Sequence, residues 1–406
     1  MPFNLYPKQK KAIESCNARI NLLEGSVRSG KTHGSYEWWA RYLLHNAPDG
    51  DLLMTGKTLK ALERNVLIPL QDYIPLKYSL HKKQAQILGK RVHLEGANDK
   101  QAEGKIRGMT IAGHYGDEVT LWPESYFVQS LARMSVSGAK MICTTNPDSP
   151  YHWLKKDWID ADKGVITQKL TIDDNIHLGS DFVESLKREY TGLFYRRYIE
   201  GLWVVAEGAV YDMYEPDYHA VKELPKMVRY FVGVDYGTNN PTVFLLIGQC
   251  QSGEFYVCKE YYHDGGEGRQ KTDAEYVNEL KSFLPKQYEN IVIDPSASSF
   301  ILACTRAGIK KIRKANNAVV DGIRSVSSLL ANDLLFCHKS CKNVNREFQA
   351  YSWDSKAQEK GEDKPIKEND HTMDALRYII YSNQRYWKSL LDRKTETIDR
   401  LEGAVL

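Results

Sequence analysis

Short apolar runs alternate with segments of helical spacing along the first half of the chain. The strand-like runs are INLLEG, DLLMTGK, MTIAGHYGDE and AKMICTTNP, and the helical segments between them include YEWWARYLL, LKALERNVL and ESYFVQSLARM. This strand–helix rhythm predicts a mostly parallel sheet with helices on both faces. We therefore predict an α/β domain over residues 1–205, in which residues 150–205 are helical and active groups lie at the carboxyl ends of the strands.

The pattern changes after residue 205. Gly and Pro interrupt residues 206–226, which we interpret as a linker between two domains. Three strand-like runs with short connections then predict an antiparallel meander: RYFVGVDYG, TVFLLIGQ and EFYVCKEYY. A helix, the strand NIVIDPS, a helix, the basic strand IKKIRKA, a helix, the strand LLFCH and the helix DHTMDALRYIIYSNQRY follow. This order predicts a ribonuclease H-like mixed sheet in a second domain over residues 227–406.

Composition excludes several classes of protein but does not reveal the function. The chain has 406 residues, of which 42% are apolar and 26% charged, as expected for two or three folded domains. Its net charge of +3 is too small to indicate nucleic-acid binding by itself. The seven scattered cysteines favour a reducing cytosol over a disulfide framework. Neither a signal peptide nor a membrane-spanning stretch is evident, so we expect no membrane association.

A glycine-rich segment links the first predicted strand to a helix. It reads EGSVRSGKTHGS over residues 24–35 and matches the phosphate-binding pattern G-x-x-x-x-G-K-[ST]. In such loops, backbone N–H groups surround the α- and β-phosphates, and glycines supply the positive φ angles required. We expect Lys31 to reach the β/γ-phosphates and Thr32 to offer its hydroxyl to Mg²⁺. The alternative is a Gly/Ser-rich turn with no ligand. The predicted nucleotide-binding residues are Gly25, Arg28, Ser29, Gly30, Lys31 and Thr32.

Two acidic residues end the strand-like run MTIAGHYGDE and are the natural partners of this loop. Asp117 is placed to hold Mg²⁺ through water, and Glu118 to polarise an attacking water. An acidic pair on the protein surface is the alternative, and His114 and Gly116 interrupt the expected aliphatic strand. Any of Arg28, Arg107 and Arg133 is a candidate for stabilising the charge that develops during hydrolysis.

Residues before the first strand offer a further contact with a nucleotide. Tyr6 and Gln9 either touch the edge of the base or belong to an ordinary exposed N-terminal helix. We include Gln9 among the predicted cofactor-binding residues.

Three acidic positions stand out in the second half. Asp235 and Asp294 end the apolar strands VGVD and IVID, and Asp374 lies on the last strong helix. Carboxylates at strand ends are suited to binding cations, and two divalent ions can stabilise both the attacking and the leaving oxygen of a phosphodiester. Asp370 or His371, four and three residues before Asp374, shares its helical face. Together these residues favour a nuclease site.

The chain resembles the large terminase subunit of tailed bacteriophages over nearly its whole length. The resemblance is carried by GSVRSGKT, YGDE, TTNP, WVVAEGAVYDMY, VGVDYG, IDPS and DHTMDALRY. It implies an ATPase that translocates double-stranded viral DNA into a procapsid and a nuclease that cuts concatemeric DNA. The implied partners are DNA, the small terminase subunit and the portal protein, with a homo-oligomer formed on the portal. The implied location is the cytoplasm of the bacterial host, outside the mature virion.

The resemblance also implies roles for individual residues. Thr144, Thr145 and Asn146 match the motif that couples hydrolysis to movement, since a Thr or Asn at a strand end can sense the γ-phosphate. The implied catalytic residues are Glu118, Asp235, Asp294 and Asp374, and the implied ligands of two Mg²⁺ or Mn²⁺ ions are Asp235, Asp294, His371 and Asp374. ATP with Mg²⁺ is the implied cofactor of the first domain.

Two alternative functions remain open at this point. A helicase–nuclease of DNA repair would separate strands and carry further helicase motifs. An assembly scaffold would bind nucleotide without turnover, although Glu118 speaks against it.

Overall fold

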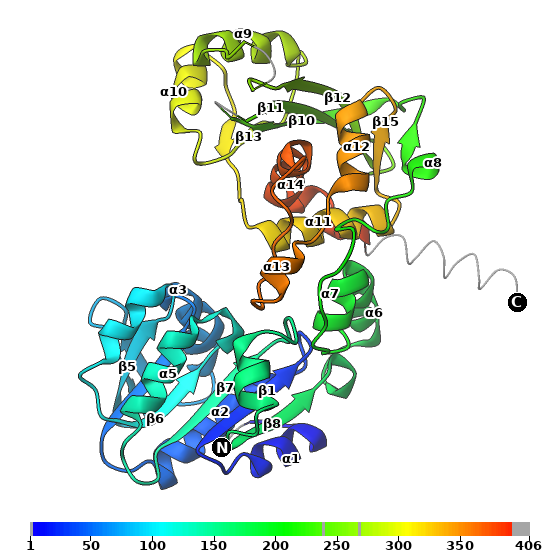
Figure 1. The fold of residues 1–406 in the computed structure, drawn as a ribbon. Coiled ribbons are helices and arrows are strands. Elements are labelled where there is room, and N and C mark those ends of the chain that lie inside the picture. The colour runs from blue at the N-terminus through cyan, green and yellow to red at the C-terminus, as the bar shows by residue number, and fades with distance from the viewer. Residues whose placement is uncertain (1–2, 238–239, 267–268, 392–406) are drawn as a thin grey trace, which may run out of the picture. The chain divides into compact units, whose positions relative to one another are not determined.

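The computed structural model describes residues 3–237, 240–266 and 269–391. It divides into two compact units, each with its own sheet (Figure 1). The first unit comprises Met1–Val183, Gly192–Val205 and Glu359–Glu362, and the second comprises Glu184–Thr191, Ala206–Gln358 and Asp363–Leu406. Residues 206–226, predicted as a linker, fall within the second unit, where they include the strand β9 (Ala220–Val221).

The first unit has an eight-stranded sheet of order β3-β4-β5-β2-β6-β7-β1-β8. Its strands are β1 (Ile20–Gly25), β2 (Asp51–Gly56), β3 (Leu76–Ser79), β4 (Gln84–Ile87), β5 (Lys90–Gly96), β6 (Ile111–Gly116), β7 (Lys140–Thr145) and β8 (Val165–Leu170). Its helices are α1 (Pro7–Ser15), α2 (Lys31–Arg41), α3 (Leu59–Leu62), α4 (Ile68–Leu70), α5 (Glu124–Arg133) and α7 (Gly192–Tyr198), and α6 (Ser180–Glu189) contains a boundary between the units. Neighbouring strands pair in parallel along β5-β2-β6-β7-β1-β8, whereas neighbouring strands pair antiparallel along β3-β4-β5. The predicted mostly parallel α/β architecture is confirmed.

The prediction that residues 150–205 are entirely helical is wrong, because this segment contributes β8. That strand pairs in parallel with β1 from Ile20–Val165 to Gly25–Leu170. It forms the edge of the sheet, and only Leu170 among its residues is buried. An edge strand with little burial needs no continuous apolar run, so its sequence VITQKL gives a weak strand signal.

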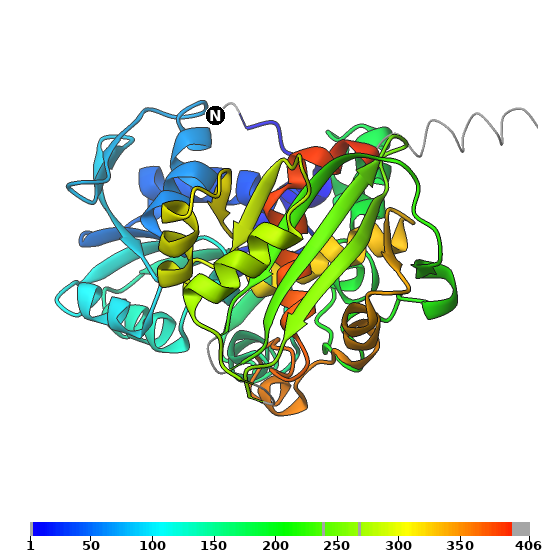
Figure 2. The same cartoon turned by 90° about the horizontal axis from the view of Figure 1, so that it is seen from above.

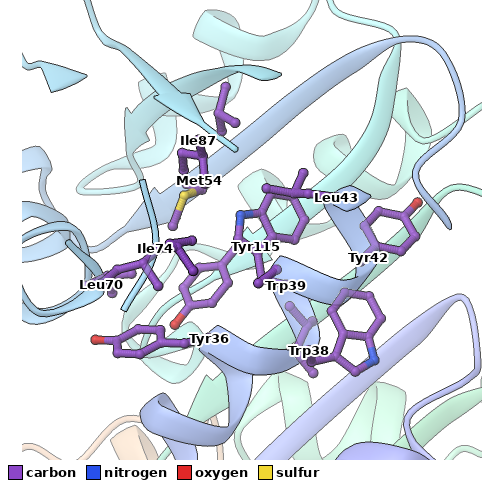
Figure 3. Packing of buried hydrophobic residues seen from close by; sticks show 14 of the residues in the cluster. Tyr36, Trp38, Trp39, Tyr42, Leu43, Met54, Leu70, Ile74, Ile87 and Tyr115 are labelled. Carbon is purple, nitrogen blue, oxygen red and sulfur yellow. The ribbon is translucent and has the colours of Figure 1, made fainter. Parts of the chain in front are cut away.

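Apolar side chains cover both faces of the first sheet. Along β1, Leu23 joins one cluster of buried residues while Ile20 and Leu22 join the other. This alternation follows from the two-residue repeat of a strand. Helix α2 contributes aromatic residues to the first cluster, where Trp39 packs against Tyr115 with ring centroids 6.0 Å apart (Figure 3). The buried sheet thus fixes the ends of β1, β6 and β7.

The second unit has a seven-stranded mixed sheet of order β14-β13-β10-β11-β12-β15-β9. Its other elements are β10 (Met227–Asp235), β11 (Thr242–Cys250), β12 (Phe255–His263), β13 (Asn290–Ile293), β14 (Ile312–Lys314), β15 (Leu335–His338), α8 (Pro216–His219), α9 (Asp273–Phe283), α10 (Ser298–Arg306), α11 (Val319–Ala331), α12 (Lys342–Ala350), α13 (Ser355–Gln358) and α14 (His371–Ser382). β10, β11 and β12 form the predicted antiparallel meander. β13 pairs in parallel with β10, and β15 with β12.

Helices cover opposite faces of this second sheet. Figure 2 shows α9 and α10 on one face of β10–β12 and α14, in red, on the other. Val232 and Val234 pack with residues of α9 and α10. Gly233 faces α14 so closely that a Cβ there would lie 2.5 Å from the carbonyl oxygen of Ala375. No helix in the described part of the chain combines the length and the apolar character needed to cross a membrane.

Candidate functional site

The phosphate-binding pattern lies on a tight loop between β1 and α2. Gly25 has φ +129°, and a Cβ there would lie 1.9 Å from the carbonyl oxygen of Leu170 in β8. Gly30, with φ +81°, caps the start of α2. Arg28, which is exposed, also has a positive φ of +55°, and its carbonyl oxygen accepts a hydrogen bond from Asn175 Nδ2 at 2.8 Å. Both glycines are therefore required by the backbone path.

The Lys31 side chain folds back into this loop. Its Nζ donates to the carbonyl oxygens of Gly25 and Ser26, to Ser29 Oγ at 3.3 Å and to Asn146 Oδ1 at 3.0 Å. Burial lowers the pKa of Lys31 to about 7, although nearby carboxylates act to raise it. An ammonium held in this position by neutral oxygens is well placed for a phosphate, which would supply the negative charge that the loop lacks.

Tyr6 and Gln9 brace the loop from α1 and the residue before it. The Tyr6 hydroxyl donates to the carbonyl oxygen of Ser29, and Gln9 Nε2 donates to that of Gly30 at 2.7 Å. Only 2% of Tyr6 and 1% of Gln9 is exposed, so the alternative of an ordinary exposed helix is wrong. Both residues also line a cavity of about 370 Å³ beside Gly30, with His33 among its other lining residues. The predicted contact with a base stays a prediction.

The end of β6 lies beside the loop. Thr144 Oγ1 donates to Asp117 Oδ1 at 2.9 Å, and Asn65 Nδ2 lies 3.4 Å from Asp117 Oδ2. Burial raises the pKa of Asp117, against the effect of these two hydrogen bonds. Glu118 has φ +52°, and its N–H donates to Thr144 Oγ1 at 3.4 Å. Asp117 and Glu118 both act electrostatically on Lys31.

The Thr144–Asn146 segment at the end of β7 joins these parts. Thr144 contacts Asp117, Thr145 Oγ1 lies 2.7 Å from Thr120 Oγ1, and Asn146 contacts Lys31. Since β7 lies between β6 and β1 in the sheet, its end reaches both the acidic pair and the loop. The structure thus brings Lys31, Asp117, Glu118, Thr144 and Asn146 together in one site.

The polar residues that interrupt β6 have structural roles. His114 is wholly buried; its Nε2 lies 2.9 Å from Thr55 Oγ1, and its ring stacks on Trp122 with centroids 5.7 Å apart. A Cβ on Gly116 would lie 2.8 Å from the Trp122 ring. The indole of Trp122 therefore packs on this strand only because His114 offers a flat ring to stack on and Gly116 has no side chain.

Two of the three candidate arginines, Arg107 and Arg133, contact each other and pair with groups outside the loop. Arg107 pairs with Glu103 at 2.7 Å, and Arg133 Nη1 donates to the carbonyl oxygen of Arg107 at 2.9 Å. Arg28, by contrast, belongs to the loop itself.

The predicted acids of the second unit lie around the first turns of α14. His371 Nδ1 is 3.0 Å from Asp235 Oδ2 at the end of β10. Burial raises the pKa of Asp235 to about 6, and the negative charges of Asp374 and Asp370 act in the same direction. Burial, reinforced by the neighbouring carboxylates, thus makes the ionised form of Asp235 less favourable than that of a free aspartate.

Each of the other carboxylates has a partner in the protein. Asp294 Oδ2 accepts a hydrogen bond from the Tyr378 hydroxyl at 2.6 Å. Burial acts to raise the pKa of Asp294, but the hydrogen bonds from Ser296 and Tyr378 outweigh it and lower the pKa. Asp374 Oδ1 accepts a hydrogen bond from Arg377 Nη2 at 2.8 Å.

Lys367 lies close to both acids of the first turn of α14. Its Nζ is 3.4 Å from Asp370 Oδ2 and 3.5 Å from Asp374 Oδ2. Sequence motifs give no sign of Lys367 or Tyr378, which reach the acids only through tertiary structure. The three-residue spacing of Asp374 and Arg377 is a signal that would have found Arg377.

Within residues 3–237, 240–266 and 269–391, no group of three or more Asp, Glu, His or Cys side chains is arranged to hold a metal ion. The carboxylates nevertheless suit a divalent cation such as Mg²⁺ or Mn²⁺, whereas the His371 imidazole is an acceptable ligand for Mn²⁺ but a poor one for Mg²⁺. Lys367 already brings one positive charge within 3.5 Å of Asp370 and Asp374.

Comparisons with known proteins agree with the arrangement in both units. The family model described as terminase large subunit, T4likevirus-type, N-terminal, matches residues 22–215. The large terminase from a thermophilic bacteriophage is 39% identical, with a TM-score of 0.86 over 95% of this chain and 100% of that one. The same protein in complex with ADP aligns at 38% identity over 94% and 100% of the two chains, with a TM-score of 0.85. Its complex with ATP-gamma-S aligns at 39% identity over 93% and 98%, with a TM-score of 0.84. No curated protein matches the chain.

Proposed function

Because the chain belongs to the large terminase family, we propose that its first unit is an ATPase that drives double-stranded viral DNA into a procapsid. The observation that carries this proposal is the convergence of Lys31, at the start of α2, with Asp117 and Asn146, which directly follow β6 and β7. Complexes of the thermophilic phage terminase with ADP and ATP-gamma-S support nucleotide binding by the same fold.

The roles of the site residues follow from their positions. Lys31 would exchange its contacts with loop carbonyls and Asn146 for the β- and γ-phosphates. Thr32 and Asp117 would hold Mg²⁺, which supplies charge neutralisation at the phosphates when bound. Glu118, next to Asp117, would orient the attacking water. Departure of Lys31 from Asn146 would report nucleotide occupancy to the end of β7, consistent with a coupling role for Thr144–Asn146.

We propose a nuclease site with a ribonuclease H-like fold in the second unit. The strand order, with an antiparallel meander flanked by parallel strands, supports this fold. Asp235, Asp294, His371 and Asp374 would hold the divalent cations, which when bound stabilise the charge on the oxygens of the phosphodiester being cut. Tyr378 and Arg377 orient Asp294 and Asp374 through the hydrogen bonds described above.

The proposal includes the partners and the place of action. The chain would work with DNA, the small terminase subunit and the portal protein, as a homo-oligomer on the portal. It would act in the cytoplasm of the bacterial host and be absent from the mature virion.

A pair of variants of the full chain tests the division of labour. Lys31→Ala removes the ammonium, so we expect phosphate release in the presence of long DNA to fall by about 10²-fold or more while plasmid cutting with Mg²⁺ or Mn²⁺ persists. Asp294→Ala should stop cutting and leave phosphate release unchanged. Loss of both activities in both folded variants would contradict two separate sites.

A further inference from the structure

A basic hollow lies on the second unit beside α12 (Figure 1 labels the helix). It has a volume of about 480 Å³ and is lined by Lys339, Lys342, Asn345, Arg346, Gln349 and Ala350. Three of these six residues are cationic and none is acidic. Within the described residues, neither Lys339 nor Lys342 forms an ion pair, and Arg346 lies 3.9 Å from Glu347 Oε1 with 56% of its side chain exposed.

The sequence of α12 keeps these charges on one face. Val344, Glu347 and Phe348 are buried, whereas Lys342, Arg346 and Gln349 are exposed. The exposed residues are spaced by four and three positions, so they follow one side of the helix. Of these exposed residues, Arg346 also interacts with Glu347 and with Tyr262 on β12.

α12 is fixed to the element that carries the acids. The N–H of Thr372 donates to Glu347 Oε2 at 2.7 Å, and the Thr372 hydroxyl donates to the same atom. Thr372 follows His371, which contacts Asp235. At the other end, the N–H groups of Asn343 and Val344 each donate to a carboxylate oxygen of Glu260 on β12 at 3.0 Å. These hydrogen bonds join the helix that carries the basic hollow to the start of α14, where His371 and Asp374 lie.

Electrostatic repulsion explains why a DNA-cutting site would need a basic surface nearby. A cluster of carboxylates repels the phosphates of DNA, so a duplex can rest there only if cations nearby offset the repulsion. We infer that the basic hollow holds the sugar–phosphate backbone of duplex DNA while the carboxylates around α14 act on it. This inference rests on the nuclease function proposed above and names the surface that would position its substrate.

The residues of the hollow favour a phosphate backbone over an acidic protein. Lys, Arg, Asn and Gln side chains are the usual donors to phosphate oxygens. A protein interface is expected to have aromatic or aliphatic anchors at its centre. Among the described residues that line the hollow, only Ala350 is apolar, and it is too small to serve as such an anchor.

A binding experiment with the full chain tests this assignment. The variant Lys339→Gln/Lys342→Gln/Arg346→Gln removes three positive charges. Binding to a fluorescent duplex of about 30 base pairs would be measured by anisotropy in EDTA at several salt concentrations. We expect about tenfold or greater weakening at low salt, and a salt slope reduced by about 0.9 for each phosphate that is no longer neutralised. The slope separates weaker binding to phosphates from a general change in affinity.

A matched control removes the same charge from the opposite side of the sheet. Lys281→Gln/Lys286→Gln/Arg306→Gln changes exposed residues on or next to α9 and α10, and it should bind as the unchanged chain does. The thermal unfolding midpoint should be unchanged in both triple variants, which would show that they are folded.

The outcomes distinguish this inference from the proposed function. Equal binding and equal salt slopes in the two triple variants would overturn the inference, even if the unchanged chain cuts plasmid. Displacement of the duplex by polyglutamate as effectively as by unlabelled duplex would also overturn it, in favour of an acidic protein partner. Failure of the unchanged chain to cut DNA with Mg²⁺ or Mn²⁺ would instead contradict the nuclease, whatever the salt slopes show.

Discussion

At the scale of single residues, buried polar groups explain features that the sequence alone leaves puzzling. His114 looks out of place in a central strand, yet it fills the space between Thr55 and Trp122. Burial lowers the pKa of His114 to about 3. The imidazole is therefore neutral in the folded protein at neutral pH, and it binds a proton more readily once the chain unfolds.

This shift predicts an acid-sensitive stability. Because the unfolded state binds the proton near pH 6.5 and the folded state only near 3, stability should fall as pH decreases through this window. By pH 5 the loss amounts to about 2 kcal/mol. His114→Gln should lack this loss, as measured by denaturant unfolding at about pH 7.5 and pH 5. His81→Gln, at an exposed position, is the control and should behave as the unchanged chain does. Identical pH dependence in all three proteins would show that His114 carries no such coupling.

The sequence anticipates the site of the first unit better than that of the second for a physical reason. Asp117 and Thr144 lie at the ends of β6 and β7, and Lys31 begins the helix that follows β1, the next strand of the same parallel sheet, so these groups must meet at one edge of the sheet. The ionic partners in the second unit depend on loop and helix packing instead. Lys367 reaches Asp370 and Asp374 from a segment with no regular element, which no local pattern indicates.

At the scale of elements, burial decides which strands the sequence reveals. β1, β2, β6 and β7 lie inside the sheet and read as apolar runs. β8 at one edge, and β3 and β4 at the other, expose part of their residues and escape the same reading. Yet β8 is essential to the loop, since the N–H of Ser26 donates to the carbonyl oxygen of Leu170 at 3.0 Å.

The close approach of β8 predicts the effect of a single methyl group. Gly25→Ala would place a Cβ 1.9 Å from the carbonyl oxygen of Leu170 at a φ of +129°. Overpacking and backbone strain together should destabilise the first unit by about 2–6 kcal/mol. Its thermal midpoint should fall by about 5 °C or more. Gly104→Ala, where nothing lies within 4 Å of the added carbon, is the matched control and should be close to neutral. A normal midpoint for Gly25→Ala would mean that β8 moves aside without any energetic penalty.

At the scale of the whole molecule, the two units have separate sheets and separate groups of buried residues. We predict that the nucleotide binds only to the first unit. We predict that the cations held by the carboxylates around α14 bind only to the second unit. Ligands that bind one folded unit should therefore stabilise that unit alone, since stabilisation follows from binding to the native state.

Calorimetry of the full chain should accordingly resolve two unfolding transitions. ADP with Mg²⁺ at about 100 times its Kd should stabilise one of them by about 2.7 kcal/mol, and Lys31→Ala should abolish that shift. Mn²⁺ without nucleotide should shift the other transition, and Asp235→Asn should abolish this second shift while leaving the response to ADP intact. The two variants serve as controls for each other, because each removes the ligand of one unit and spares the other. The opposite outcome is a single transition that ADP and Mn²⁺ both shift, together with loss of both shifts in either variant. It would show that the two units unfold as one cooperative body and that the two sites are coupled through it.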